Sequence, residues 1–267
     1  MTVPNARDRL PTPEALLAFI LRYIQVPSRR EEFRVDSARQ DEFLLLFGLT
    51  HRVRRLAQAY LRLRKGDFEV EGQILVRAAL EHAVTAQWAY LTVGGIDRLK
   101  TSATSDQYTF VKLIAEYSTD PAAPAHVQEF KEQVLAGPGL PKFTEMIKHL
   151  DNNGFLRTTY KVLSQVVHVT HQATLDALGT GDEGEVTLKL QPDADVGHET
   201  LYALASSCML AAWIVADLEG STDEFGRLQD YSWQLSLPYR LDASLPANTR
   251  RFEDKVAYEP IQEEAES

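Results

Sequence analysis

The sequence predicts an all-α fold, a single-domain helical bundle with one minor β-hairpin near residues 184–191. Apolar residues recur at helical spacing over long segments, for example at Leu49, Val53, Leu56 and Tyr60. Glycine and proline residues separate these segments from one another. Only the stretch EGEVTLKLQP alternates apolar and polar residues, and a single strand of this kind cannot form a sheet alone.

The helices are predicted in chain order from caps, periodicity and stop signals. The first begins near Thr12, where Thr-Pro-Glu supplies an N-cap, a proline at the first helical position and an early acid, and it stops before Pro27. Further helices are expected over residues 36–65, 68–93, 96–117, in a short segment before Gly137, and over 142–150, 155–178 and 196–219. The segment DYSWQLSLPYR is expected to pack loosely after the last helix.

The chain is divided into three parts on this basis. An N-terminal helix and charged segment cover residues 1–35, a helical core domain covers residues 36–235, and an acidic disordered tail covers residues 248–267. With 44% hydrophobic residues among 267, the chain has enough apolar material for one large core.

Charge and cysteine content restrict the classes of function. A net charge of −10 argues against a general nucleic-acid coat protein, although a local basic groove remains compatible with it. Cys208 is the only cysteine, so no intrachain disulfide forms and a reducing, cytoplasmic location is expected. The N-terminus lacks a signal-peptide pattern. The apolar run 201–218 is short for a membrane span and contains Ser206 and Ser207, so it is predicted to be a buried core helix.

The stretch VRAALEHAVTAQW places two charges inside an apolar helix. Arg77 and Glu81 lie one turn apart, on the same side as Val84 and Trp88. A buried unpaired charge costs several kcal/mol, so the two side chains are expected to pair. Two interpretations stay open. The pair is a structural clamp between helices, or Arg77 presents donors to an anion while Glu81 holds it in place.

A second polar row lies on FLRTTYKVLSQVVHVTHQATLDAL, where Ser164, His168 and His171 are one turn apart. His168 could act as a general acid or base. His168 and His171 could share a metal with Glu81 or His51. Ser164 could be a nucleophile with His168 as its base, although no Gly-x-Ser-x-Gly elbow surrounds it. A solvated helix face is the remaining interpretation.

A basic stripe lies on the segment HRVRRLAQAYLRLRK. Its members share one face of the predicted helix and are His51, Arg54, Arg55, Gln58, Arg62 and Lys65. Such a stripe either contacts phosphates or is a solvated face balanced by neighbouring acids. Arg54 and Arg55 are therefore candidate ligand-binding residues.

Two motifs together resemble a family of uncharacterised, mostly bacterial all-helical proteins and, more loosely, the HEPN superfamily. VRAALEHAVTAQWAYL supplies R-x-x-x-E followed by aromatics, and YKVLSQVVHVTH supplies Y-x-x-x-S-x-x-x-H. The resemblance covers roughly residues 40–180 and implies a ribonuclease of toxin or phage-defence type. The positions that match are Arg77, Glu81, Tyr160, Ser164 and His168. The short arginine-to-histidine motif of HEPN ribonucleases is not matched, because Arg157 and His168 are too far apart.

Three functions are therefore expected in order. The first is a protein that binds RNA or a nucleotide and cleaves RNA without a metal or cofactor. Its catalytic residues are Arg77, Glu81, Ser164 and His168, and its ligand-binding residues are Tyr160, His171, Arg54 and Arg55. The second is a non-catalytic interaction module that forms a homodimer. The third is a metal-dependent helical-bundle enzyme, similar to thiol-transferase-like bundles, with His51, His168 and His171 as ligands.

Overall fold

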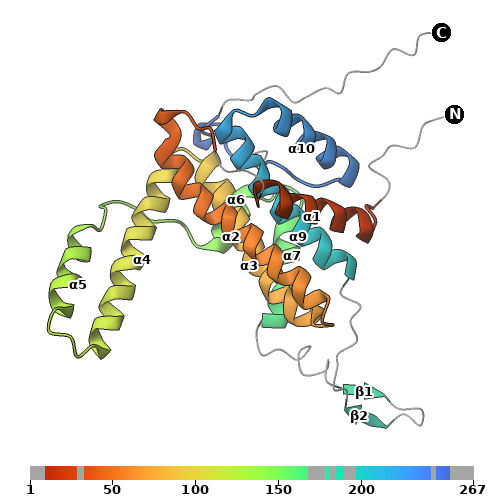
Figure 1. Cartoon of the computed structure of the whole chain (residues 1–267), viewed down its shortest axis with the longest axis horizontal. Coiled ribbons are helices and arrows are strands. Elements are labelled where there is room, and N and C mark those ends of the chain that lie inside the picture. Colours follow the sequence, from red (N-terminus) through yellow and green to blue (C-terminus); the bar gives the residue numbers. More distant parts are fainter. Residues whose placement is uncertain are drawn as a thin grey trace.

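Two helices that are apolar on almost every side form the centre of the fold. They are α3 (Glu69–Leu91) and α9 (Gly197–Glu219), which pack against each other along their length. The computed structural model describes residues 10–28, 33–167, 178–180, 185–188, 197–241 and 245–252. Within these ranges it contains nine α-helices and one two-stranded hairpin (Figure 1). The predicted all-α fold with a minor hairpin is confirmed.

The remaining helices of the bundle surround this pair. α1 (Pro13–Ser28) and α2 (Gln40–Arg64) cover α9, and α2 also packs along α3. α6 (Phe143–Leu150) and α7 (Phe155–Val167) cover another side of α3, and α10 (Thr222–Leu235) packs on α9. A short 3₁₀ turn at Ser37–Arg39 precedes α2. Another 3₁₀ turn, at Ala247–Thr249, lies in the segment that follows α10.

The tight contact between α2 and α3 depends on a glycine. A Cβ atom at Gly72 would lie 2.8 Å from the ring of Tyr60, which is itself buried. Because such a distance is below van der Waals contact, no larger residue fits here without moving the ring. Gly72 therefore permits the close approach of α2 to α3 at this point.

Two helices leave the bundle as an arm. α4 (Gly95–Tyr117) begins after Gly94, whose φ of 70° is in the left-handed region that favours glycine. α5 (Ala123–Glu132) folds back along α4. Figure 1 shows that this pair extends away from the other helices. Only the base of α4 contacts the bundle, through residues such as the buried Leu99.

The hairpin begins earlier than the sequence predicts. β1 (Leu178–Thr180) pairs antiparallel with β2 (Val186–Leu188), with Leu178 opposite Leu188. β2 lies inside the predicted range 184–191, whereas Leu178 was expected to end a helix. The three residues of β1 are too few to show the alternation of a strand. The helical pattern before them therefore led to a predicted helix that ended too late, at Leu178.

The helix α10 was not predicted. Its N-cap Ser221 accepts a hydrogen bond from the backbone N–H of Glu224, and Asp223 and Glu224 provide acids in the first turn. Leu228 and Leu235 are buried, so the segment packs against the bundle instead of lying loosely on it. The polar residues between these two leucines hide the helical period.

The start of the predicted disordered tail is ordered. The backbone N–H of Val93 donates to the carbonyl of Thr249 at 3.0 Å, and the N–H of Arg251 donates to the carbonyl of Leu91 at 2.9 Å. An isolated bridge also joins Thr92 to Arg250. These contacts fasten residues 249–251 to the turn between α3 and α4, and residues 253–267 lie outside the described ranges.

The apolar helix α9 is long enough to cross a membrane by length and composition. However, 78% of its most apolar window is buried inside the fold, and Cys208 at its middle is buried as predicted. This is the environment of a core helix.

Candidate functional site

The predicted pair of Arg77 and Glu81 lies where α3 meets α7. Arg77 Nε donates to Glu81 Oε1 at 3.0 Å, and Arg77 Nη2 donates to Tyr160 Oη at 2.9 Å. The guanidinium carbon also lies 4.8 Å from the centre of the Tyr160 ring. These side chains, together with Ser164 one turn further along α7, are called the Arg77 cluster below.

The Arg77 cluster is only partly buried. The exposed fraction of the side chain is 15% for Arg77 and 36% for Glu81, although the sequence predicts that both are enclosed. Ile74, on the same side of α3, is 46% exposed. α7 covers the Arg77 side of α3 incompletely, so Glu81 keeps contact with water. The desolvation cost of this pair is therefore well below that of a fully buried pair.

The α7 side of the cluster is fixed by packing and by one local hydrogen bond. The Tyr160 ring lies 4.8 Å from the ring of Phe143 in α6, centre to centre. Ser164 Oγ donates to the backbone carbonyl of Tyr160 at 2.6 Å, within the same helix. Because the Ser164 proton is engaged by the backbone, this geometry does not favour the nucleophile interpretation.

The two histidines of the predicted row, His168 and His171, lie outside the described residues. The acid–base interpretation and the metal interpretation therefore remain predictions. Among the residues that the structure describes, no group of three or more histidine, cysteine, aspartate or glutamate side chains could hold a metal ion. His51 is the one member of the proposed metal triad whose environment is described.

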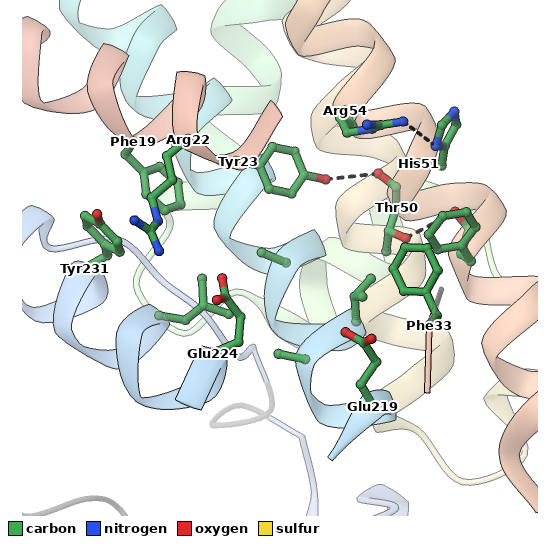
Figure 2. A pocket seen from close by; sticks show the side chains of 15 residues that line it. Phe19, Arg22, Tyr23, Phe33, Thr50, His51, Arg54, Glu219, Glu224 and Tyr231 are labelled. Carbon is green, nitrogen blue, oxygen red and sulfur yellow. Dashed lines mark hydrogen bonds between the residues drawn. The ribbon is translucent and has the colours of Figure 1, made fainter. Parts of the chain in front are cut away.

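His51 and Arg54 lie in a pocket on the other side of the bundle, between α1, α2, α9 and α10. Figure 2 shows its aromatic walls and the charged groups at its edge, including Arg22, Glu219 and Glu224. The cavity volume is about 70 Å³. An engineered cavity of about 150 Å³ holds benzene, so this pocket is too small for a nucleotide.

The environment of His51 does not favour a role as a metal ligand. Arg54 Nη2 lies 3.2 Å from His51 Nδ1, and because arginine only donates, Nδ1 is the acceptor. Burial, then the charges of Arg54 and Arg55, lower the pKa of His51 below its ordinary value. The same positive charges would repel a metal cation at this position.

This lowered pKa predicts a specific pH dependence of stability. Since the pKa of His51 is lower in the folded protein, the unfolded chain binds more protons as the pH falls below about 7. We expect the wild type to lose stability relative to His51→Asn between about pH 7 and pH 5, because asparagine keeps an acceptor and does not titrate. Urea unfolding across this range measures the difference. Parallel stability curves for the two proteins would contradict the assignment.

The basic stripe and the Arg77 cluster lie in different places on the bundle. Arg54 faces α1, α9 and α10, whereas Arg77 faces α7. Arg55 is exposed to solvent on α2. Further along the same helix Arg64 is paired with Glu69 at 2.8 Å. The predicted ligand-binding residues therefore fall into two separate places, of which only the Arg77 cluster combines residues from both predicted motifs.

Sequence reasoning missed the most deeply buried polar side chain of α3. Gln87 is fully buried, and its amide nitrogen donates to the carbonyls of Leu210 at 2.9 Å and Tyr239 at 3.2 Å. Its amide oxygen accepts from the backbone N–H of Leu241 at 3.3 Å. The signal was one glutamine in the apolar run AVTAQWAYL.

A network of charged side chains was also missed. Tyr90 donates to a carboxylate oxygen of Asp217 and accepts from Arg39, and Arg251 binds both carboxylate oxygens of Glu42. Burial and the Asp217 carboxylate raise the pKa of Tyr90, so its phenol stays protonated and can donate. The network joins α2, α3, α9 and the segment after α10, and we interpret its role as holding these elements together.

Comparison with known proteins was made against families, curated proteins and solved structures. Residues 43–185 match a family of unknown function, DUF5677, over more than half of the chain. The chain belongs to this family. No curated protein and no solved structure gives a match. The DUF5677 span begins within α2 and includes α3 to α7, and thus all four members of the Arg77 cluster. Much of the His51 pocket is lined by residues outside this span.

Proposed function

We propose that this DUF5677 protein binds a phosphate-bearing ligand, RNA or a nucleotide, at the Arg77 cluster. The observation that carries the proposal is the fixed position of the Arg77 guanidinium, which Glu81 holds on one side and Tyr160 on the other. A planar guanidinium with several donors in one plane matches the oxygen geometry of phosphate. The side chain is also still 15% exposed, which allows a ligand to approach it.

Glu81 is the natural competitor of a phosphate for Arg77. With 36% of its side chain exposed, its carboxylate can be solvated when another acceptor replaces it. The exchange conserves the number of charge-assisted hydrogen bonds on the guanidinium. Glu81 therefore positions Arg77 and gives way when the ligand is bound.

RNA cleavage is the further part of this proposal. The four-residue spacing of Tyr160, Ser164 and His168 is that of one helix face, which is the sequence-based reason to include His168. The ribose 2′-oxygen attacks the neighbouring phosphorus while His168 accepts its proton, and the bond to the 5′-oxygen breaks as this oxygen takes a proton from water. Arg77 stabilises the charge that develops on the phosphate oxygens. This reaction requires no metal or cofactor.

The resemblance to HEPN proteins supports a role of toxin or phage-defence type in the cytoplasm, where RNA substrates are abundant. The location can be tested by fractionating cells that express the tagged chain. Recovery in the membrane pellet after a high-salt wash would contradict it.

Cleavage of a mixed, end-labelled RNA pool tests the proposed reaction. We expect cleavage that persists in EDTA and falls at least about 100-fold in His168→Ala, because the proton transfer step is lost. His126→Ala is the matched control, since His126 is exposed on α5 and should leave cleavage unchanged. Cleavage that EDTA abolishes would indicate a metal-dependent enzyme. No cleavage by the wild type would remove the catalytic part of the proposal and leave binding to be measured by itself.

A further inference from the structure

The arm formed by α4 and α5 has no core of its own. The structure describes all of α5 and none of its residues is buried, and in α4 only Gly95 and Leu99, at its base, are buried. Isolated helices of this length are marginal in water, since packing of an apolar face supplies most of the stability of a helix. The arm therefore lacks the burial that a pair of helices ordinarily needs.

An apolar patch lies on the exposed side of the arm. It consists of Phe110, Leu113, Ile114 and Tyr117, whose exposed fractions are 63%, 51%, 53% and 89%, and which line one shallow hollow. By helical spacing the patch lies on the opposite side of α4 from the half-buried Tyr108, Val111 and Ala115. α5 therefore leaves the patch uncovered.

The order of residues in the patch is symmetric. Along α4 it reads aromatic, aliphatic, aliphatic, aromatic, with spacings of three, one and three residues. A two-fold axis between positions 113 and 114 would place Phe110 opposite Tyr117 of a second copy, and Leu113 opposite Ile114. Two-fold interfaces bring one surface against itself, so they require such self-complementarity. A different partner would not require it.

We infer that the arm is a homodimerisation element, in which α4 pairs antiparallel with α4 of a second copy of this chain. The two α4 helices enclose both patches between them, and α5 of each copy lies on the outer side of its own α4. This interaction is separate from the Arg77 cluster and does not depend on its function.

The exposed area is sufficient for such a dimer. From the exposed fractions, the four side chains present roughly 500 Å² of apolar surface on each copy, at ordinary side-chain areas. Two copies would bury up to about 1,000 Å² through these residues alone, which is about the minimum for a specific interface. A patch of this size is also near the upper limit for an uncovered monomer surface.

Sedimentation equilibrium of the full chain tests this inference directly. We expect the wild type to be a dimer at micromolar concentrations, and Leu113→Glu to weaken the association at least about 100-fold, because two buried glutamates would approach each other near the axis. Leu44→Glu is the matched control, since Leu44 is an exposed leucine on α2 with an exposed fraction of 62%. It should leave the association unchanged.

A charge pairing distinguishes the antiparallel register from other contacts. Ile114→Lys alone should also weaken the association, whereas mixing it with Leu113→Glu should restore a heterodimer, because position 113 faces position 114 of the partner. Circular dichroism should show unchanged folding, since both residues are exposed. A wild type that stays monomeric to about 100 μM, or a Leu113→Glu variant that stays dimeric, overturns the inference. A mixture without recovery overturns the antiparallel arrangement.

Discussion

Replacement of Gln87 by leucine is expected to lower the free energy of unfolding by about 3 kcal/mol, the cost of leaving buried backbone groups without partners. The Gln87 amide hydrogen bonds to backbone groups of Leu210, Tyr239 and Leu241. Leucine has nearly the same volume, so the loss comes from these hydrogen bonds and not from a cavity. Tyr239 and Leu241 follow α10, outside any helix, and they have no regular backbone pairing to replace the amide.

The matched control for this change is Gln73→Leu on the same helix. Gln73 is also buried, but within the described residues its side chain makes no hydrogen bond. We expect its replacement to change stability by less than about 1 kcal/mol. Urea unfolding of the three proteins, followed by circular dichroism, gives the comparison. Equal losses in the two variants would show that buried glutamines on α3 are interchangeable and that the Gln87 hydrogen bonds are not special.

The helices that are bounded by clear stop signals were predicted to within a few residues. α3, α4, α6 and α9 follow their predicted ranges because glycine or a change of composition ends each of them. α10 was missed because its polar residues obscure the spacing of Leu228 and Leu235. A helix is recognised from apolar periodicity when its buried face is wide. The buried face of α10 is narrow, since Leu228 and Leu235 are its buried residues.

The candidate site was predictable within each helix but not between helices. The one-turn spacing of Arg77 and Glu81 fixes their contact whatever the tertiary structure. Their contact with Tyr160 depended on which helix packs against α3, and the spacing of residues along the chain could not predict this packing. Arg54 was grouped with them on charge, yet α2 turns it toward α1 and α9. The faces that two helices turn toward each other are determined by the packing of the whole core.

Replacement of Arg77 by lysine is expected to weaken RNA binding by at least about tenfold, because the two side chains differ in donor geometry more than in charge. Lysine keeps the positive charge and can still reach Glu81. However, it loses the planar fork that contacts Glu81 and Tyr160 from different nitrogens. If the role of Arg77 were purely structural, the Arg77→Lys variant would instead be less stable, and the folded variant would bind RNA with unchanged affinity.

Arg64→Lys is the control for general electrostatic effects. Arg64 is an arginine on α2 that pairs with Glu69 at 2.8 Å, in the same kind of ion pair. It lies outside the Arg77 cluster, so its replacement should leave RNA affinity unchanged. Both variants preserve the net charge of the chain, which removes long-range electrostatics from the comparison.

The most direct test of the proposed site is the affinity of the wild type, Arg77→Lys and Arg64→Lys for a labelled single-stranded RNA, measured by fluorescence anisotropy at one salt concentration. If the Arg77 cluster is the binding site, we expect Arg77→Lys alone to lose affinity while all three proteins remain folded. Equal affinities in the three proteins, or no binding by the wild type, would contradict it and leave Arg77 as a clamp between α3 and α7.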